Sequence, residues 1–285
     1  MVLVIYNTSA GKGSIDKGIR NLCNDLIYSG TTFTTIKITQ FTKSNARELL
    51  ENGQIKQVII CGGDGTVNRA INQMDGFLHD LEIGIIPCGY GNLIANSLDA
   101  TSSVKSFVSE SSDTVYNEVK IGQANNQYFL NVASIGLTAD TVSMVERFRQ
   151  TDFGSLFYRT FGGIIIHILF FCITLVTKKT FNMRSDYPSS RAWMRTWDEA
   201  SNHSFLEFSD IRDMISQYKT LYLSGERYTS LNSNGTVTTS GGDIIKHEYP
   251  FSWQIDGEPQ KKTRSLKINL NCQKLKILTI HQDWI

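Results

Sequence analysis

The first third of the chain alternates short apolar runs with stretches of helical spacing, and this alternation constrains the fold more than any other feature. The apolar runs cover residues 2–6, 34–39, 57–61 and 82–87, and the helical stretches cover about 15–29, 44–52, 66–74 and 91–98. Strand and helix in turn at this spacing predict a parallel sheet covered on both faces. We therefore expect an N-terminal α/β domain over residues 1–115.

From about residue 116 the pattern changes to strands with little helix. The strand-like runs are residues 117–123, 127–136, 251–260, 265–270 and 274–280. Asn125-Asn126, between two alternating runs, indicates a hairpin turn, because asparagine tolerates left-handed backbone. We expect a second, β-rich domain over residues 116–285, with a substrate cleft between the two domains.

One apolar segment interrupts the β-rich half. Residues 161–177 are apolar for seventeen residues, short of the roughly 20 that a spanning helix needs. Helical spacing over about 155–177 predicts one apolar stripe, formed by Phe157, Phe161, Ile164, Ile168, Phe171 and Leu175. Three interpretations stay open: a core helix, a helix that lines a lipid pocket or lies in a bilayer surface, and a transmembrane span.

Charge and cysteine usage exclude several classes of protein. Lys and Arg number 28 against 27 for Asp and Glu, so the chain has no overall electrostatic footprint for nucleic acid. The five cysteines are odd in number and never form a C-x-x-C pair, which argues against a disulfide framework and a zinc site. The first residues lack the basic segment of a signal peptide. These features predict a cytoplasmic protein with reduced thiols.

A glycine-rich loop, CGGDGTVN at residues 61–68, follows the third apolar run. Gly62, Gly63 and Gly65 would let backbone N–H groups approach phosphate oxygens, and their tolerance of positive φ would curl those groups into a nest. The helix expected from Thr66 adds positive charge at its N-terminus. Because an acid would repel bare phosphate, Asp64 is predicted to bind magnesium or to handle the proton of an attacking hydroxyl. A tight turn without function is the alternative.

Several motifs in order resemble the diacylglycerol kinase catalytic-domain family, which includes bacterial soluble lipid kinases and sphingosine kinases, with NAD kinases as distant relatives. The resemblance lies in NTSAG (7–11), GGDGTVN (62–68), PCGYGN (87–92), NVASIGLTAD (131–140) and Asp256-Gly257-Glu258. It implies a Rossmann-like N-terminal domain, a C-terminal β-sandwich, and an active site in the cleft between them that uses ATP and Mg²⁺. On the residues alone, without the resemblance, a hairpin turn is the favoured interpretation of Asp256-Gly257-Glu258.

The resemblance also implies the site residues. The nucleotide-binding residues would be Asn7, Gly11, Thr39, Gly62, Gly63, Gly65, Thr66, Asn68, Gly89, Gly91 and Asn92. Asp64 and Glu258 would be the catalytic carboxylates, with Asp256 behind them and Asp64 also as the metal ligand. Branches of the family differ over which acid takes the proton of the lipid hydroxyl, and that choice stays open here.

Three positions depart from the family pattern. Tyr90 stands where the family has a phosphate-contacting Thr or Ser. His203 replaces an aspartate of an auxiliary magnesium site, and histidine is a poor ligand for that cation. Val142 stands where sphingosine kinases carry the aspartate that receives the sphingoid amine. The last departure favours diacylglycerol or another neutral lipid, with a sphingoid base or ceramide still open.

The sequence thus predicts a lipid kinase that meets its lipid substrate at the membrane surface. A NAD kinase-like phosphotransferase and a catalytically degenerate lipid-binding protein are the alternatives. No nucleic acid partner is expected, and the oligomeric state stays open, a homodimer included.

Overall fold

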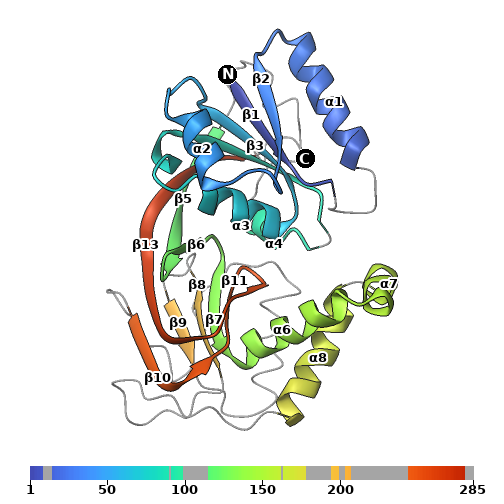
Figure 1. The fold of residues 1–285 in the computed structure, drawn as a ribbon, viewed down its shortest axis with the longest axis vertical. Helices are drawn as coiled ribbons and strands as arrows, with labels where there is room; N and C mark the ends of the chain where they lie inside the picture. Colours follow the sequence, from blue (N-terminus) through green and yellow to red (C-terminus); the bar gives the residue numbers. More distant parts are fainter. Residues whose placement is uncertain are drawn as a thin grey trace. The chain divides into compact units, whose positions relative to one another are not determined.

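A computed structural model of the chain describes residues 1–8, 15–89, 91–98, 115–161, 163–177, 194–198, 203–206 and 243–279 (Figure 1). Its contacts divide the chain into two compact units, Met1–Ile121 with Gln273–Ile285, and Gly122–Cys272. The first unit has a parallel α/β architecture and the second an antiparallel one, which confirms the predicted fold class. The sequence places residues 116–285 in one domain, whereas here the chain from Gln273 joins the first unit.

The parallel sheet of the first unit is built from the four predicted apolar runs. Strands β1 (Val2–Tyr6), β2 (Phe33–Lys37), β3 (Gln57–Gly62) and β4 (Glu82–Pro87) pair in the order β2-β1-β3-β4. The helices of this unit are α1 (Ile15–Tyr28), α2 (Lys43–Leu50), α3 (Asp64–Gln73) and α4 (Leu93–Ser97), with the 3₁₀ turn η1 (Leu78–Asp80). Leu3, Ile5, Ile59 and Ile60 have no exposed surface. Helices connect successive strands, so the strands run parallel and are apolar on both faces.

The last long strand, β13 (Thr263–Thr279), also pairs with this sheet. Lys276 and Ile277 lie opposite Glu82 and Ile83 of β4, in parallel. The sequence predicts two strands, at 265–270 and 274–280, but the structure has one continuous strand. The polar residues between the two predicted runs include Asn271, whose φ is 52°. Asparagine adopts this left-handed conformation at low cost, so the apolar alternation breaks without ending the strand.

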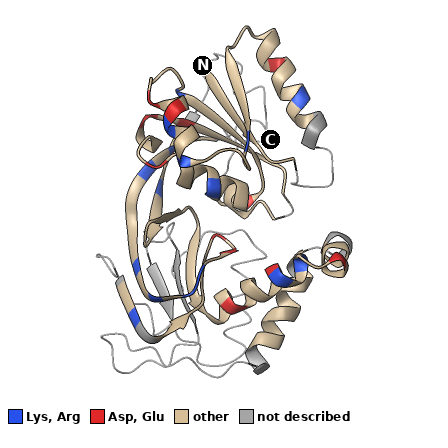
Figure 2. Ribbon diagram, in the orientation of Figure 1, with Lys and Arg blue, Asp and Glu red and all other residues tan. Residues whose placement is uncertain are grey.

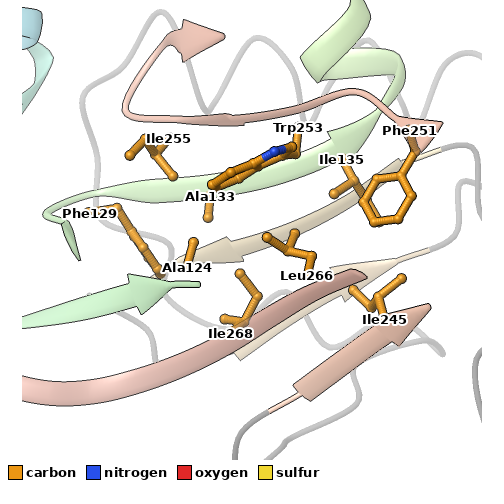
Figure 3. Close-up of a cluster of buried hydrophobic side chains, with 10 residues drawn as sticks. All are labelled: Ala124, Phe129, Ala133, Ile135, Ile245, Phe251, Trp253, Ile255, Leu266 and Ile268. Carbon is orange, nitrogen blue, oxygen red and sulfur yellow. The ribbon is translucent and has the colours of Figure 1, made fainter. Parts of the chain in front are cut away.

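The second unit is a β-sandwich. One sheet has the order β12-β11-β7-β8-β9, and its members are β12 (Glu258–Pro259), β11 (Trp253–Ile255), β7 (Val132–Gly136), β8 (Met194–Asp198) and β9 (His203–Leu206). The facing strands are β5 (Val115–Ala124), β6 (Gln127–Phe129), β10 (Asp243–Phe251) and β13. Figure 3 shows their side chains meeting between the sheets, with the Trp253 indole drawn between Ile255 and Ile135 and with Phe129 beside Ala124.

The predicted Asn-Asn hairpin is confirmed. Ala124 of β5 pairs with Gln127 of β6, and Asn125 lies at a φ of 53° in the two-residue turn between them. A two-residue hairpin turn favours positive φ, which asparagine supplies.

Three helices follow β7, where the sequence predicts only one. They are α6 (Leu137–Arg149), α7 (Asp152–Phe161) and α8 (Gly163–Thr177). Helix α6 gives a weak apolar signal because its buried face includes Thr138, Ala139 and Thr141. The single apolar stripe over 155–177 is wrong, because the segment forms two helices, and Ile168 of the expected stripe is exposed.

Helix α8 packs on α6, where the Thr174 hydroxyl donates to Sδ of Met144 (3.3 Å) and the rings of Phe170 and Phe148 lie 5.2 Å apart. Among the described helices none is long and apolar enough to cross a bilayer. The transmembrane interpretation of residues 161–177 therefore finds no support in the described part of the chain.

Candidate active site

The loops that follow β1, β3 and β4 meet at one edge of the parallel sheet. The strands are parallel, so their carboxyl ends share this edge, the usual position of ligands in such sheets. Asn7, just after β1, donates its backbone N–H to the carbonyl of Cys61 (3.1 Å). Its Nδ2 donates to Oγ1 of Thr66 on α3 (3.0 Å). Asn7 thus links the end of β1 to the glycine-rich loop.

The glycines let two loops cross backbone against backbone. A Cβ on Gly89 would lie 2.6 Å from the Cα of Gly63 and 2.9 Å from Oδ1 of Asn92, and a Cβ on Gly62 would overlap the side chain of Thr66. The described glycines with positive φ all lie elsewhere, so the predicted left-handed nest at Gly62, Gly63 and Gly65 is wrong. Close packing explains Gly62, Gly63 and Gly89 instead.

Asn92 closes the loop after β4. It lies at a φ of 49°, its Oδ1 accepts the N–H of Gly89 (2.8 Å), and its Nδ2 donates to the Gly89 carbonyl (3.0 Å). Its amide therefore shapes the loop that crosses Gly63. In the predicted nucleotide site, Asn92 would act by fixing main-chain geometry.

Asp64 lies between the two crossing loops, as the first residue of α3. Its Oδ1 accepts the N–H of Ile94, the second residue of α4 (2.8 Å), and a Cβ on Gly91 would lie 3.3 Å from its Oδ2. Burial raises the pKa of Asp64, and hydrogen bonds from backbone N–H groups, that of Ile94 foremost, partly oppose this shift. The link to Ile94 leaves no sequence signal, because any residue offers a backbone N–H.

The other predicted nucleotide-binding residues have varied surroundings. Thr66 is buried and its hydroxyl accepts the hydrogen bond from Asn7, and Gly65 is the second residue of α3. Asn68 is buried, and its Oδ1 accepts Nδ2 of Asn72 one helical turn later (3.2 Å). Thr39 is exposed beyond the end of β2. Gly11 and Tyr90 lie outside the described residues.

These contacts thus join a cluster from three loops of the first unit. Its members are Asn7, Gly62, Gly63, Asp64, Thr66, Gly89, Gly91, Asn92 and Ile94. Asp64 begins α3 in the same cluster, and the dipole of this helix favours an anion at its N-terminus.

The predicted late acids belong to the second unit, at the tip of the β11–β12 hairpin. Ile255 pairs with Glu258, and between them Asp256 and Gly257 have φ angles of 48° and 84°. Two successive positive φ angles are what a two-residue Asp-Gly turn requires. The hairpin interpretation of this motif is therefore right, and Glu258 begins β12 directly after the turn.

Asp256 anchors this hairpin to β7. Its carboxylate accepts three backbone N–H groups, from Leu130, Asn131 and Val132, each at 2.9 Å. Its own N–H donates to the carbonyl of Val132 (2.8 Å). Charge-assisted bonds of this kind are roughly twice as strong as neutral ones. This geometry gives Asp256 a positioning role, while Glu258 stays half-buried at the start of its strand.

The described residues contain no group of three or more His, Cys, Asp and Glu side chains that could hold a metal. A single carboxylate such as Asp64 is enough for another kind of metal site. At phosphate sites Mg²⁺ takes one or two carboxylates and completes its coordination shell with phosphates and water. The run expected to correspond to the auxiliary magnesium site is residues 202–207. His203 begins β9, whereas Asn202 and Glu207, at the two ends of this run, lie outside the described residues.

Comparisons with known proteins show what the chain resembles. Residues 1–124 match the family model described as diacylglycerol kinase catalytic domain. A protein of Streptococcus pneumoniae serotype 4 with a provisional lipid kinase name is 32% identical over 162 residues, which cover 55% of this chain and 53% of the relative. The diacylglycerol kinase of Bacillus subtilis is 27% identical over 162 residues, covering 54% and 52%. The chain spans about half the length of the curated relatives it matches.

Solved structures extend the likeness of fold beyond the matched domain. A crystal structure of a diacylglycerol kinase from Bacillus anthracis aligns with 100% of this chain and 98% of that chain, at a TM-score of 0.62 and 17% identity. At this identity the likeness shows the fold alone. Over residues 1–124 the chain is thus similar in sequence to the diacylglycerol kinase catalytic domain, and the solved structures add a likeness of fold over the whole chain.

Proposed function

We propose that this protein is an ATP-dependent lipid kinase that transfers the γ-phosphoryl group to the hydroxyl of diacylglycerol or a related neutral lipid. The observation that carries this proposal is the position of Asp64. It lies where two glycine loops cross, at the N-terminus of α3, with one carboxylate oxygen bound to the N–H of Ile94. A helix N-terminus beside side-chain-free loops suits a phosphate chain, and the nearby acid suits the chemistry at its end.

In the proposed reaction the lipid hydroxyl oxygen attacks the γ-phosphorus, and the bond from that phosphorus to the bridging oxygen breaks and releases ADP. The hydroxyl proton passes to a carboxylate, for which Asp64 and Glu258 are the candidates. Because burial raises its pKa, Asp64 is a stronger base than an exposed aspartate. Mg²⁺, when bound with ATP, would neutralise phosphate charge, with Asp64 as its protein ligand.

Val142 supports a neutral lipid. It lies on the buried face of α6, with 2% of its surface exposed, two residues after Asp140. A carboxylate at this position would be the partner of a cationic lipid amine, and a buried valine offers none.

Helices α7 and α8 support substrate capture at a bilayer surface. Phe153, Leu156, Ile165 and Leu169 are exposed, and Figure 2 shows no Lys, Arg, Asp or Glu on the described part of α8. An exposed apolar surface of this kind is typical of binding to lipid or to another protein. We propose that this surface contacts the membrane from which the lipid comes. We also propose that the protein is cytoplasmic and binds the membrane transiently.

A substrate panel tests the proposal. Radiolabelled ATP is incubated with the protein and mixed micelles of diacylglycerol, ceramide, sphingosine or polyprenol, and NAD is assayed in parallel. Labelled lipid, with diacylglycerol as the best acceptor, is expected. Transfer to NAD alone would favour the NAD kinase-like alternative. ATP binding without transfer to any acceptor would favour a degenerate lipid-binding protein.

A further inference from the structure

A buried chain of hydrogen bonds runs through the second unit to the Asp256-Gly257 turn. Thr138, near the start of α6, donates its hydroxyl to Oγ of Ser134 on β7 (2.9 Å). Nε2 of Gln254 on β11 donates to the same Ser134 oxygen (2.7 Å). Oε1 of Gln254 accepts the backbone N–H of Gly257 (2.7 Å).

Gln254 is an unusual residue for its position. It is 1% exposed, although its strand neighbours Trp253 and Ile255 already fill the core between the sheets. Alternation along β11 turns Gln254 to the other face, which α6 covers, and there it pairs with Ser134 in register. Burying an amide costs free energy unless both its groups are hydrogen-bonded, and here both are.

The place where Gln254 is bonded gives it a function beyond packing. Its oxygen holds Gly257, the residue between Asp256 and Glu258. Asp256 is held on the other side of the turn by the N–H groups of Leu130 and Asn131, just before β7, and of Val132, which begins β7. The backbone that carries Glu258 is therefore fixed from two sides by buried side chains.

We propose that Gln254 is a positioning residue for Glu258, acting through the N–H of Gly257 and held in place by Ser134. This inference rests on the proposed lipid kinase reaction, in which Glu258 is one of the two reactive carboxylates. It adds Gln254 and the hydroxyl of Ser134 to the residues on which the transfer step depends. Small displacements of a reactive group can lower a rate strongly, on the order of a hundredfold for 1 Å.

A double-mutant cycle separates positioning from general stability. Gln254→Met keeps the length of the side chain and removes both hydrogen bonds. It is expected to lower kcat for lipid phosphorylation by about 10- to 100-fold and to leave the KM for ATP within about twofold. In a Glu258→Gln background, assayed with excess enzyme, Gln254→Met should lower the residual rate no further, because the group that it positions is already gone.

Two companion variants keep the test decisive. Ser134→Ala leaves the hydrogen bond between Gln254 and Gly257 in place and should lower kcat by less than Gln254→Met. If Gln254→Met does not fold, Ser134→Ala still tests the inference. Thr141→Val removes a buried hydroxyl of α6 whose hydrogen bond lies within the helix, to the Leu137 carbonyl (2.9 Å). It is the matched control, with a similar loss of stability and an unchanged kcat expected.

The outcomes point to different failures. Losses that multiply in the double variant, or an equal loss of kcat in Thr141→Val, overturn the positioning role while the kinase proposal stands. No transfer to any lipid by the wild-type protein overturns the kinase proposal, and this inference with it.

Discussion

Gly63 and Gly89 face each other so closely that a Cβ on Gly89 would lie 2.6 Å from the Cα of Gly63. The Gly63 Cα belongs to the main chain and the position of a Cβ is fixed by its own main chain, so no side-chain rotation can relieve the overlap. The crossing also holds the two loops between which Asp64 lies.

Gly89→Ala is therefore expected to destabilise the fold by roughly 1–3 kcal/mol, because it forces one loop away from the other. Urea unfolding measures the change. Gly18→Ala is the matched control, since Gly18 lies in α1 with nothing within 4 Å of its Cβ position. That substitution should stabilise the protein by about 0.5–1 kcal/mol, because glycine is unfavourable inside a helix. Equal effects at the two positions would contradict the close crossing.

Asp64→Asn is expected to raise the free energy of unfolding at pH 7. The folded-state pKa of Asp64 lies above its ordinary value of 3.8, so the ionised carboxylate reduces stability at pH values above the folded pKa. The reduction disappears as pH falls through that folded pKa towards 3.8. Asparagine keeps an oxygen to accept the N–H of Ile94 and carries no charge.

Urea unfolding of wild type and Asp64→Asn between pH 4 and 8 tests this dependence. The advantage of the variant should be largest near neutral pH and should shrink on acidification. Thr39→Ala, at an exposed position beyond β2, is the control and should show no such trend. A difference between wild type and Asp64→Asn that is constant across this range would contradict the buried, charged state of Asp64.

Asp256→Asn should mainly reduce stability, whereas Glu258→Gln should mainly reduce activity. The Asp256 carboxylate accepts three backbone N–H groups, and an amide would present its NH₂ to at least one of them. We expect a loss of roughly 2–4 kcal/mol of folding stability for Asp256→Asn, from thermal or urea unfolding. Glu258→Gln should change stability by less than about 1 kcal/mol and lower lipid phosphorylation at least tenfold. Similar stability losses in both variants would assign Glu258 a structural role as well.

Leu156→Ser should weaken binding to lipid vesicles about tenfold, because a leucine side chain contributes roughly 1.5–3 kcal/mol when it leaves water. Co-sedimentation with vesicles of phosphatidylglycerol and phosphatidylcholine measures the affinity. Leu156 on α7 is 65% exposed, and Ile27 on α1 is 62% exposed, so Ile27→Ser is a control of matched exposure. If the two variants lose affinity equally, α7 is not the membrane-binding surface.

Sequence patterns predicted most of the first unit because its apolar runs are strong and its connections are short. The predicted strand at 2–6 is β1, and the predicted strands near 34–39, 57–61 and 82–87 are β2, β3 and β4. Motif order located the loops that meet at Asp64. The reason for the glycines was not predictable, because a close approach between Gly63 and Gly89 depends on tertiary structure and not on local φ.

The second unit was harder to predict for two physical reasons. Helix α6 buries small and hydroxyl-bearing residues such as Ala139 and Thr141, which give little apolar periodicity. Gln254 shows no motif at all, since its importance comes from a register that places it opposite Ser134. Buried polar residues of this kind emerge only when the strands are paired.

The most direct test of the central claim is the transfer of labelled phosphate from γ-labelled ATP to diacylglycerol in mixed micelles, with ATP binding measured on the same samples. We predict labelled phosphatidic acid from the wild-type protein. Asp64→Asn should lower its rate at least a hundredfold and still fold and bind nucleotide. Wild-type protein that neither binds ATP nor labels any lipid, or Asp64→Asn with an undiminished rate, would contradict the account.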